Sequence, residues 1–457
     1  MPFKKIMTDK KNIIEKFLIW YKKFQVSKSP QMNLVWGFFL YTLVGFGLLS
    51  IPLFHKTNVG ILDNLFISTS AISTTGLVTV SVFDSYNIFG QFIVMGLFQI
   101  GGIGYMTLTT YYLLFTTKRI THWHNKLIGA EFTLPKTIKI KDFIKSVVIF
   151  TVIMETLGAI CFYIAFKQTG METFKALWFS IFHSVSAFCT AGFGLFNNSF
   201  EDFNDNNFIN TIISVLAIAG SLGFIVITDL WYRIRRKSKS LSFTTKIVIN
   251  GFIFLLFLGT CLVYITEPSI QISDSKLSES FFQAMTAMTT VGFNTIPTSG
   301  LSLPILLFVT FLMYIGASPS GTAGGLKITT LTAMISVLKS RLFGQKRISF
   351  LGRLIPFERL YVATSTFILY TSIIFLFTFL LTYTEQFEFE RILFEVASAL
   401  GTVGLSTGIT GGLTEIGKVL VIILMFVGRV GVLTFGFALL KRKKEDNDVQ
   451  IEDDLAV

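Results

Sequence analysis

Long apolar segments alternate with polar ones along most of the chain. A helix needs roughly 20 apolar residues to span a bilayer core of about 30 Å, and eight segments reach that length. They are Asn33–Phe54, Phe92–Phe115, Phe143–Phe166, Phe208–Tyr232, Ile247–Thr266, Leu303–Leu338 (interrupted), Leu360–Tyr383 and Ile416–Leu440. We therefore expect an all-α polytopic membrane protein with eight transmembrane helices.

Shorter apolar segments lie in the alternate connections between the long ones. Each has roughly 10 to 14 residues, which is too few to span a bilayer, and each ends in a turn that contains glycine. Irregular backbone at membrane depth is tolerated only where protein buries it or where it lines a watery cavity. These segments predict four units, each made of a helix, a re-entrant helix, a turn and a second helix.

The four glycine turns repeat one another at intervals of 116, 100 and 112 residues. Ten residues before each glycine stands a Phe, six before stands a Ser or Thr, and five before stands an Ala. Self-similarity at a long period marks repeated structural units, and four of them can surround an axis with pseudo-fourfold symmetry. The turns are Thr74-Thr75-Gly76-Leu77, Thr190-Ala191-Gly192-Phe193, Thr290-Val291-Gly292-Phe293 and Thr402-Val403-Gly404-Leu405.

The repeated turn suits a selectivity filter for a monovalent cation. Rings of backbone carbonyls can replace the hydration shell of potassium, and pointing them at one axis requires backbone angles that favour glycine. The re-entrant helix would direct its negative dipole end at the cation. A plain helix end is the better interpretation of a single Thr-x-Gly, but four copies in register favour the filter. Small-residue clusters about 24 to 28 residues later are mostly expected to pack helices closely.

Basic residues lie at every second membrane exit. The net charge is +12, and 31 of the 39 Lys and Arg fall in five segments. Short loops rich in Lys and Arg stay cytoplasmic, so both termini are expected inside and the charge faces the membrane rather than nucleic acid. Of these segments, 1–29 is interpreted as an amphipathic helix on the membrane lipids, or else as a disordered basic tail. The five are Met1–Ser29, Lys118–Lys145, Arg233–Lys246, Lys339–Arg359 and Lys441–Lys444.

Composition argues against an enzyme. Only 14% of residues are charged, against about 25% in soluble proteins, and 52% are apolar. The ionisable groups within the spans are few and scattered, namely Glu155, His183, Lys327 and Arg429. His122-Trp123-His124 lacks partners at metal-ligand spacing. No catalytic residue and no covalent cofactor are therefore expected, and Glu155 and His183 are interpreted as helix-packing groups.

The sixth apolar segment contains an insert that the other units lack. Proline, glycines and small hydroxyl residues there cannot hold a regular helix. We interpret the insert as a mobile gate below the third turn, with a passive kink as the alternative. Its sequence is Gly316-Ala317-Ser318-Pro319-Ser320-Gly321-Thr322-Ala323-Gly324-Gly325-Leu326-Lys327.

Arg429 lies 25 residues beyond Gly404, one helix length from the turn toward the cytoplasm. A charge inside the bilayer is expensive and usually serves a role. We expect Arg429 to set an electrostatic barrier in the pore, with a buried ion pair as the alternative. Lys327 is expected either in the inner cavity or snorkelling to the membrane face.

In these turns, in the insert and in Arg429, the chain resembles the membrane subunit of Ktr potassium uptake systems, within the Trk/Ktr/HKT superfamily. The resemblance spans about Asn33 to Leu440 and all four turns. Trk-type relatives carry two additional N-terminal helices, which this sequence lacks. Plant HKT proteins that prefer sodium have Ser where Gly76 stands, so the resemblance favours potassium. It also implies a gating loop at Gly316–Lys327 and a helical Arg, here Arg429, in the conduction path.

The resemblance further implies a homodimer with one pore per subunit, docked on a cytosolic nucleotide-binding regulatory ring in a bacterial cell membrane. Transport of K⁺ would be driven by the membrane potential, with Na⁺ dependence as a family trait. The nearest rival is a sodium or sodium/potassium transporter of the same superfamily; a membrane-embedded enzyme and a non-conducting sensor or scaffold are the others. The expected division is a basic cytoplasmic segment (1–29), four pore repeats (30–118, 119–237, 238–343, 344–442) and a cytoplasmic tail (443–457).

Overall fold

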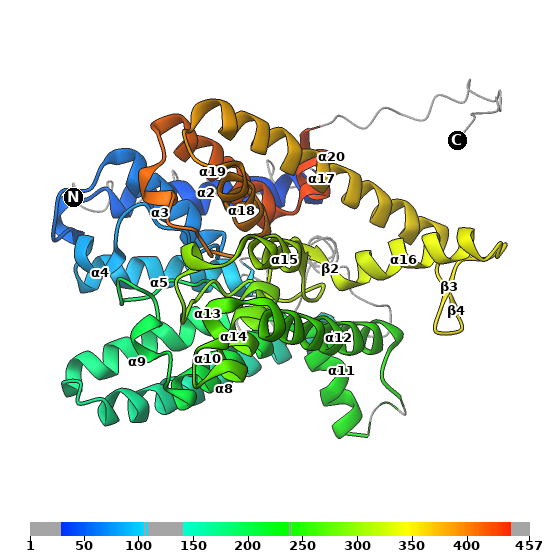
Figure 1. The fold of residues 1–457 in the computed structure, drawn as a ribbon, viewed down its shortest axis with the longest axis horizontal. Coiled ribbons are helices and arrows are strands. Elements are labelled where there is room, and N and C mark those ends of the chain that lie inside the picture. Colours follow the sequence, from blue (N-terminus) through cyan, green and yellow to red (C-terminus); the bar gives the residue numbers. More distant parts are fainter. Residues whose placement is uncertain (1–28, 105–106, 108–139, 237, 239, 440–457) are drawn as a thin grey trace, which may run out of the picture.

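The computed structural model describes residues 29–104, 107, 140–236, 238 and 240–439 of the chain. Helices build almost all of this part, and they recur in one order: a long helix, a short helix, a turn and a further helix (Figure 1). Residues 1–28 of the basic segment expected at 1–29, the histidines His122 and His124, and the cytoplasmic tail expected at 443–457 lie outside the described residues.

The first two units contain the following elements. In the first, α2 (Pro30–Leu49), a 3-10 turn η1 (Pro52–Phe54), α3 (Ile61–Ile72), the single turn α4 (Val82–Ser85) and α5 (Ile88–Ile103) follow one another. The second unit consists of α8 (Ile140–Gln168), α9 (Thr173–Phe188), η2 (Glu201–Phe203), α10 (Asn207–Ser221) and α11 (Phe224–Ile234), in this order.

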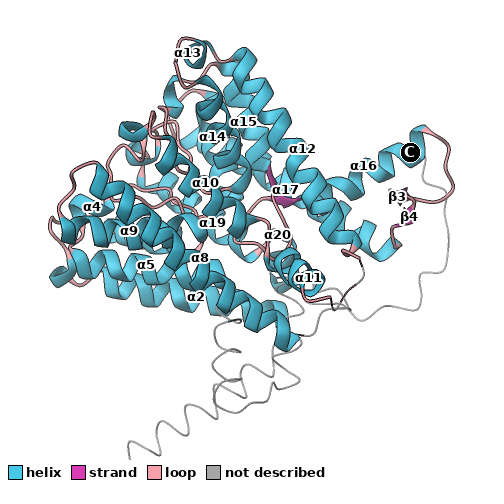
Figure 2. Ribbon diagram, turned by 90° about the horizontal axis from the view of Figure 1, so that it is seen from below, coloured by secondary structure: helices cyan, strands magenta, loops and turns pink. Residues whose placement is uncertain are grey.

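The last two units are again mainly helical, and the third adds two very small sheets (Figure 2). The third has α12 (Phe243–Thr266), α13 (Pro268–Gln271), α14 (Lys276–Thr289), η3 (Thr298–Gly300), α15 (Leu303–Tyr314), β1 (Ile315–Gly316), β2 (Leu326–Lys327), α16 (Ile328–Leu342), β3 (Ser349–Phe350) and β4 (Arg353–Leu354). The fourth has α17 (Phe357–Thr384), α18 (Phe389–Gly401), η4 (Thr410–Gly412), α19 (Glu415–Val430) and α20 (Val432–Leu439). Strand β1 pairs in parallel with β2, so the insert between them leaves and returns at one place.

Helix ends follow their sequence signals. Ser29 precedes Pro30 and its Oγ accepts the backbone N–H of Met32, which caps α2. Asn87 caps α5 by accepting the N–H groups of Phe89 and Gly90. These caps satisfy donors that the first helical turn cannot pair internally.

Four helices within the described residues are long and apolar enough to cross a membrane, namely α2, α8, α12 and α17. Their outward faces are apolar: on α8, Ile149, Val152, Leu157 and Ile160 are each more than half exposed. An apolar surface of that length marks a lipid or protein contact rather than a face in water. The long helices therefore have the character of membrane-spanning segments.

The expectation of continuous spans at Phe208–Tyr232 and Ile416–Leu440 is wrong. The pair α10 and α11 is bent by 90°, and the pair α19 and α20 by 96°. When each bent pair is taken as one span, the described residues supply up to six spans, and the expected span Phe92–Phe115 lies partly outside them. The bends fall at Gly223 and Gly431, whose φ angles of 85° and 90° suit glycine and take the chain out of the helix.

The short helices α3, α9, α14 and α18 lie inside the bundle. The repeated aromatic and alanine positions explain this, because these side chains are at most 1% exposed. They pack each short helix against its neighbours and fix its depth. The residues are Phe66, Phe182, Phe282 and Phe394, with Ala71, Ala187, Ala287 and Ala399.

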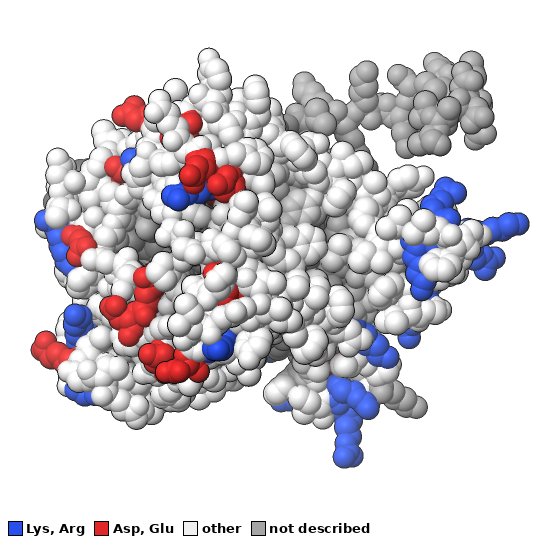
Figure 3. Space-filling view, in the orientation of Figure 1, with Lys and Arg blue, Asp and Glu red and all other residues white. Residues whose placement is uncertain are grey.

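Charge separates along the molecule as the sequence predicts. Lys and Arg gather at the end formed by α11, α16 and the β3–β4 hairpin, whereas most Asp and Glu lie over the opposite half (Figure 3). The described part of the chain thus has one basic end and one acidic end.

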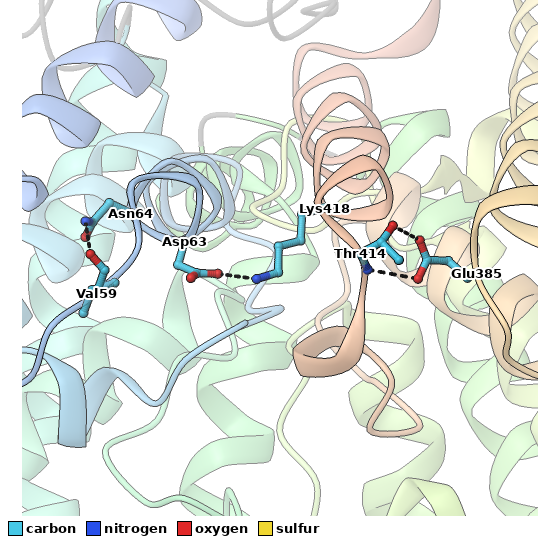
Figure 4. Close-up of polar contacts among 6 residues, drawn as sticks. All are labelled: Val59, Asp63, Asn64, Glu385, Thr414 and Lys418. Carbon is cyan, nitrogen blue, oxygen red and sulfur yellow. Dashed lines mark hydrogen bonds and ion pairs between the residues drawn. The ribbon is translucent and has the colours of Figure 1, made fainter.

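The fourth unit closes against the first. Asp63 at the start of α3 and Lys418 of α19 point toward one another, with 2.7 Å between Oδ1 and Nζ (Figure 4). Beside them, Thr414 donates its backbone N–H to Oε2 of Glu385 at 3.0 Å, and its hydroxyl donates to Oε1 at 2.5 Å. Residues 355 positions apart are therefore held together at one end of the bundle.

Candidate functional site

Each short helix ends in the same unusual backbone conformation. Thr74, Thr190, Thr290 and Thr402 all have positive φ angles, between 48° and 55°. A β-branched residue is strained in this left-handed region, by about 1–2 kcal/mol. Strain of this kind persists only where the surroundings impose it, and it clusters at functional sites.

Two backbone hydrogen bonds impose the conformation in each turn. In the first unit, Thr74 N donates to Ala71 O at 3.0 Å and Thr75 N donates to Ser70 O at 2.9 Å. The corresponding pairs recur in the other three turns at 2.8 to 3.4 Å. This pattern ends a helix in a left-handed residue and turns the chain back on itself.

A Ser or Thr stands six residues before each glycine, a repeat position for which the sequence suggested no role. The hydrogen bonds of its hydroxyl provide one. Ser70 Oγ accepts the N–H of Gly76, and Ser398 Oγ accepts the N–H of Gly404, both at 3.1 Å. In the third unit, Thr286 Oγ1 instead donates to Phe293 O at 2.6 Å. These three hydroxyls tie the first, third and fourth turns to the helices that precede them, whereas the buried hydroxyl of Ser186 in the second unit has no hydrogen-bond partner among the described residues.

The four turns contact one another in a closed ring. A Cβ atom added to Gly76 would lie 2.5 Å from the carbonyl oxygen of Ala191, and one added to Gly192 would lie 2.5 Å from that of Val291. A Cβ on Gly292 would likewise meet Val403 O, and one on Gly404 would meet Thr75 O. The order of contacts returns to its start, so each turn presents a carbonyl to the glycine of the turn before it.

All four glycines have positive φ, from 67° to 92°. Only glycine combines that conformation with so close an approach of a neighbouring backbone. The structure thus brings all sixteen residues of the sequence-predicted turns together in one ring.

A cavity of about 350 Å³ lies on one side of the ring. All four glycines line it, together with polar residues of the segments that follow the turns. Glu201 is its one charged lining residue within the described chain, and Asn294 Nδ2 donates to its Oε1 at 2.7 Å. Partial burial raises the pKa of this carboxyl.

The segment between β1 and β2 crosses the other side of the ring. Thr322 Oγ1 lies 3.1 Å from the donating hydroxyl of Thr190, and Gly324 N donates to Thr290 Oγ1 at 3.0 Å. A Cβ on Gly324 would meet Gly401 O and Thr402 Oγ1. The loop therefore contacts the first residue of three turns, which is where the sequence analysis expected a gate.

Arg429 fastens this loop to another unit. Its Nη1 donates to Thr322 O at 2.6 Å, and its Nη2 donates to the carbonyl oxygens of Gly101 and Gly102 at the end of α5. The guanidinium forms charge-assisted hydrogen bonds, which are stronger than neutral ones. One side chain of the fourth unit thus joins the third unit to the first.

Lys327 lies in a second cavity, of about 260 Å³, together with Arg429. Its Nζ donates to Ala323 O at 2.6 Å and to Gly324 O at 2.8 Å. Of the two expectations for this side chain, the cavity position is therefore the one observed. Two cationic side chains line this cavity below the ring.

The small-residue clusters serve two purposes. Gly101 packs against Ile72 O, Gly220 against Phe188 O and Gly428 against Leu400 O, so close packing is confirmed. The last glycine of three clusters has positive φ and ends the helix, a role that the sequence analysis missed; these are Gly104, Gly223 and Gly431.

His183 and Glu155 form the packing hydrogen bonds that the sequence predicts. His183 Nε2 accepts the N–H of Leu195 at 3.1 Å, and Glu155 Oε2 accepts from Gln99 Nε2 at 3.0 Å. Sequence reasoning missed Glu395, a fully buried carboxyl in α18. Its signal was a lone acidic residue within a buried repeat, nine residues before Gly404.

Comparison with known proteins places this geometry in a family. The profile of the TrkH family, described as a cation transport protein, matches residues 40–450. The Ktr system potassium uptake protein B of Bacillus subtilis is 33% identical over 426 residues, covering 92% of this chain and 94% of that protein. The potassium/sodium uptake protein NtpJ of Enterococcus hirae is 34% identical over 438 residues, covering 92% and 95%.

A solved structure shows the same fold. The potassium transporter TrkH from Vibrio parahaemolyticus superposes with a TM-score of 0.74 at 20% identity, over 90% of this chain and 85% of that one. The apolar helices and the matched relatives agree that this is a membrane protein. The chain belongs to the TrkH family of cation transport proteins, with Ktr-type membrane subunits among its relatives.

Proposed function

We propose that this chain is the ion-conducting subunit of a Ktr-type potassium uptake system in a bacterial cell membrane. The observation that carries the proposal is the closed ring of Gly76, Gly192, Gly292 and Gly404, in which each glycine faces a carbonyl of the next turn. Backbone oxygens gathered in this way can replace the hydration shell of a cation. Relatives named as potassium uptake proteins match more than nine-tenths of the chain.

In this proposal the residues 74–77, 190–193, 290–293 and 402–405 form a four-part selectivity filter within four repeats and eight spans. The hydroxyls of Thr74 and Thr402 support it, because both are buried and without a hydrogen-bond partner among the described residues. An unpaired buried hydroxyl is costly. A dehydrated K⁺ at the first position would offset that cost by taking the hydroxyl as a ligand.

The loop Gly316–Lys327 is proposed as the gate, because it contacts three turns from the side opposite the 350 Å³ cavity. The guanidinium of Arg429 holds this loop at Thr322 and adds positive charge below the ring. Conduction then requires the loop to move aside or to open a path. No chemical step is involved, and the membrane potential supplies about 2.3 kcal/mol per charge per 100 mV.

The basic end of the molecule is proposed to face the cytoplasm, because short loops rich in Lys and Arg stay inside. That end would dock the cytosolic nucleotide-binding ring, and two copies of the chain would form the homodimer with one pore in each. Sodium dependence belongs to the same proposal.

The second candidate is combined sodium and potassium transport. It is favoured by one observation, the 34% identity to a protein named as a potassium/sodium uptake protein. Flux of K⁺ and of Na⁺ into liposomes that contain the purified chain, with and without the cytosolic ring, separates the two. Uptake of K⁺ in large excess over Na⁺ supports the first, and equal uptake supports the second. No flux of either ion under any of these conditions would contradict both.

A further inference from the structure

One register position of the short helices differs in every unit. Nine residues before the glycine of each turn stand Ile67, His183, Gln283 and Glu395, and all four side chains are at most 1% exposed. The neighbouring repeat positions keep Phe, Ser or Thr, and Ala. This position behind the ring is therefore buried in all four units, but each unit has a different type of side chain there.

Two of these residues hold the segment that leaves the turn. His183 accepts the N–H of Leu195, three residues after Gly192, at 3.1 Å, while its Nδ1 donates to Phe179 O at 2.7 Å. In the fourth unit, Glu395 Oε2 accepts the hydroxyl of Ser406 at 2.9 Å, and its Oε1 accepts the hydroxyl of Thr410. Ile67 has no polar atom with which to do the same.

The carboxyl of Glu395 organises a small network. Because the hydroxyl of Ser406 gives its proton to Glu395, its oxygen remains free to accept the N–H of Gly408 at 3.0 Å. Gly408 has a φ of 90°, so the chain turns sharply there. Ser406, Gly408 and Thr410 all line the 350 Å³ cavity together with Gly404.

We propose that Glu395 is a positioning residue that sets the ion discrimination of the fourth turn. The four turns of the ring are then held in place by different contacts. The carboxylate touches no ion. It fixes the segment from Leu405 to Thr410, and so fixes the carbonyls on either side of Gly404. The inference rests on the proposed function of the ring as a cation filter.

Conservative variants separate position from folding. In Glu395→Gln the amide oxygen still accepts from one hydroxyl, but the NH₂ group donates toward the other and forces it to reorient. Thr410→Val removes one donor at nearly constant volume, whereas Thr410→Ser keeps the hydroxyl. Glu385→Gln is the matched control, since Glu385 is likewise buried and also accepts a Thr hydroxyl, at the end of α17 away from the cavity lining.

The experiment compares K⁺ and Na⁺ flux into liposomes for each variant, after thermal unfolding in detergent has shown that the variant is folded. Loss of a hydrogen bond to the buried carboxyl group predicts a fall of roughly tenfold in the K⁺ to Na⁺ ratio for Glu395→Gln and Thr410→Val. Thr410→Ser and Glu385→Gln should keep the wild-type ratio. The double variant Glu395→Gln/Thr410→Val should lose less than the sum of the two single losses, because both changes weaken the same hydrogen-bond network around Glu395.

Wild-type ratios in folded, conducting Glu395→Gln and Thr410→Val would overturn the inference while leaving the proposed function standing. Should Glu395→Gln fail to fold, Thr410→Val decides alone. Absence of K⁺ flux in the wild type would instead overturn the proposed function, and this inference with it.

Discussion

Gly404 lies against the carbonyl oxygen of Thr75, a residue of the first turn and 329 positions earlier in the chain. This contact closes the ring, because the other three glycines face only the turn that follows them in the sequence. The salt bridge between Asp63 and Lys418 joins the same two units at the end of the bundle (Figure 4). The geometry of the site therefore depends on the fourth unit returning to the first.

A methyl group at Gly404 should abolish K⁺ flux. It would overlap the carbonyl of Thr75 and force a φ of 92° on a residue with a Cβ, so the ring would have to open. Flux into liposomes measures the loss. Gly96→Ala is the control, because nothing lies within 4 Å of its Cβ position in the middle of α5 and alanine favours a helix. Normal flux in Gly404→Ala would show that the ring is not the path.

Releasing the loop should raise flux. Arg429→Gln removes the charge that binds Thr322 O and the end of α5, so the segment between β1 and β2 becomes easier to displace. We expect the K⁺ flux of Arg429→Gln to rise several-fold in liposomes without the cytosolic ring. The flux of Arg429→Lys should lie between those of the wild type and Arg429→Gln, because lysine keeps the charge but not the planar fork of donors. Deletion of residues 319–321 should act in the same direction. Wild-type K⁺ flux in both Arg429→Gln and the deletion of residues 319–321 would contradict the proposed gate.

The Asp63–Lys418 pair should stabilise the fold measurably. Its side chains are only 17% and 18% exposed, whereas those of the Arg391–Glu388 pair are 41% and 64% exposed. A double-mutant cycle on the free energy of unfolding should give about 1 kcal/mol or more for the first pair and roughly 0–0.5 kcal/mol for the exposed one. Equal coupling energies would mean that the Asp63–Lys418 contact between the first and fourth units adds nothing to the stability of the fold beyond what an exposed ion pair adds.

Glu201 should make cation capture depend on pH. Burial raises its pKa above the ordinary value of a glutamate, so it loses its negative charge at a higher pH than an exposed carboxyl does. The Michaelis constant for K⁺ at low ionic strength should therefore rise as the pH falls, and a Glu201→Gln variant should have the raised value at every pH. A Glu201→Gln variant with the pH profile of the wild type would assign the effect to another group.

The turns could be predicted from the sequence because their backbone requires particular residues. A positive φ beside a neighbouring carbonyl allows only glycine at Gly76 and its three equivalents, so glycine occupies this position in all four repeats. The burial of Phe66 and Ala71 could be predicted as well, because the same two residue types stand at the same distances before the glycine in all four units. These positions repeat because each unit meets the same neighbours.

The bends and the bracing could not be predicted in the same way. Hydropathy along 416–440 stays high whether the chain runs straight or turns by 96°, so the run of apolar residues carried no sign of the bend at Gly431. The partners of Glu395 and Arg429 depend on how segments distant in the chain meet, as Arg429 and Gly101 do across 328 positions. Such contacts have no period in the sequence.

Whether the ring of glycine turns binds the cation is tested most directly by the position of a heavy potassium substitute in crystals of the protein, located by its anomalous scattering after exchange into Rb⁺ or Tl⁺. If the ring is the cation filter, a peak should lie inside it, next to the carbonyl oxygens of Thr75, Ala191, Val291 and Val403, and should be lost in Gly404→Ala. Ions bound only elsewhere on the protein, with the ring empty at saturating Rb⁺ or Tl⁺, would contradict it.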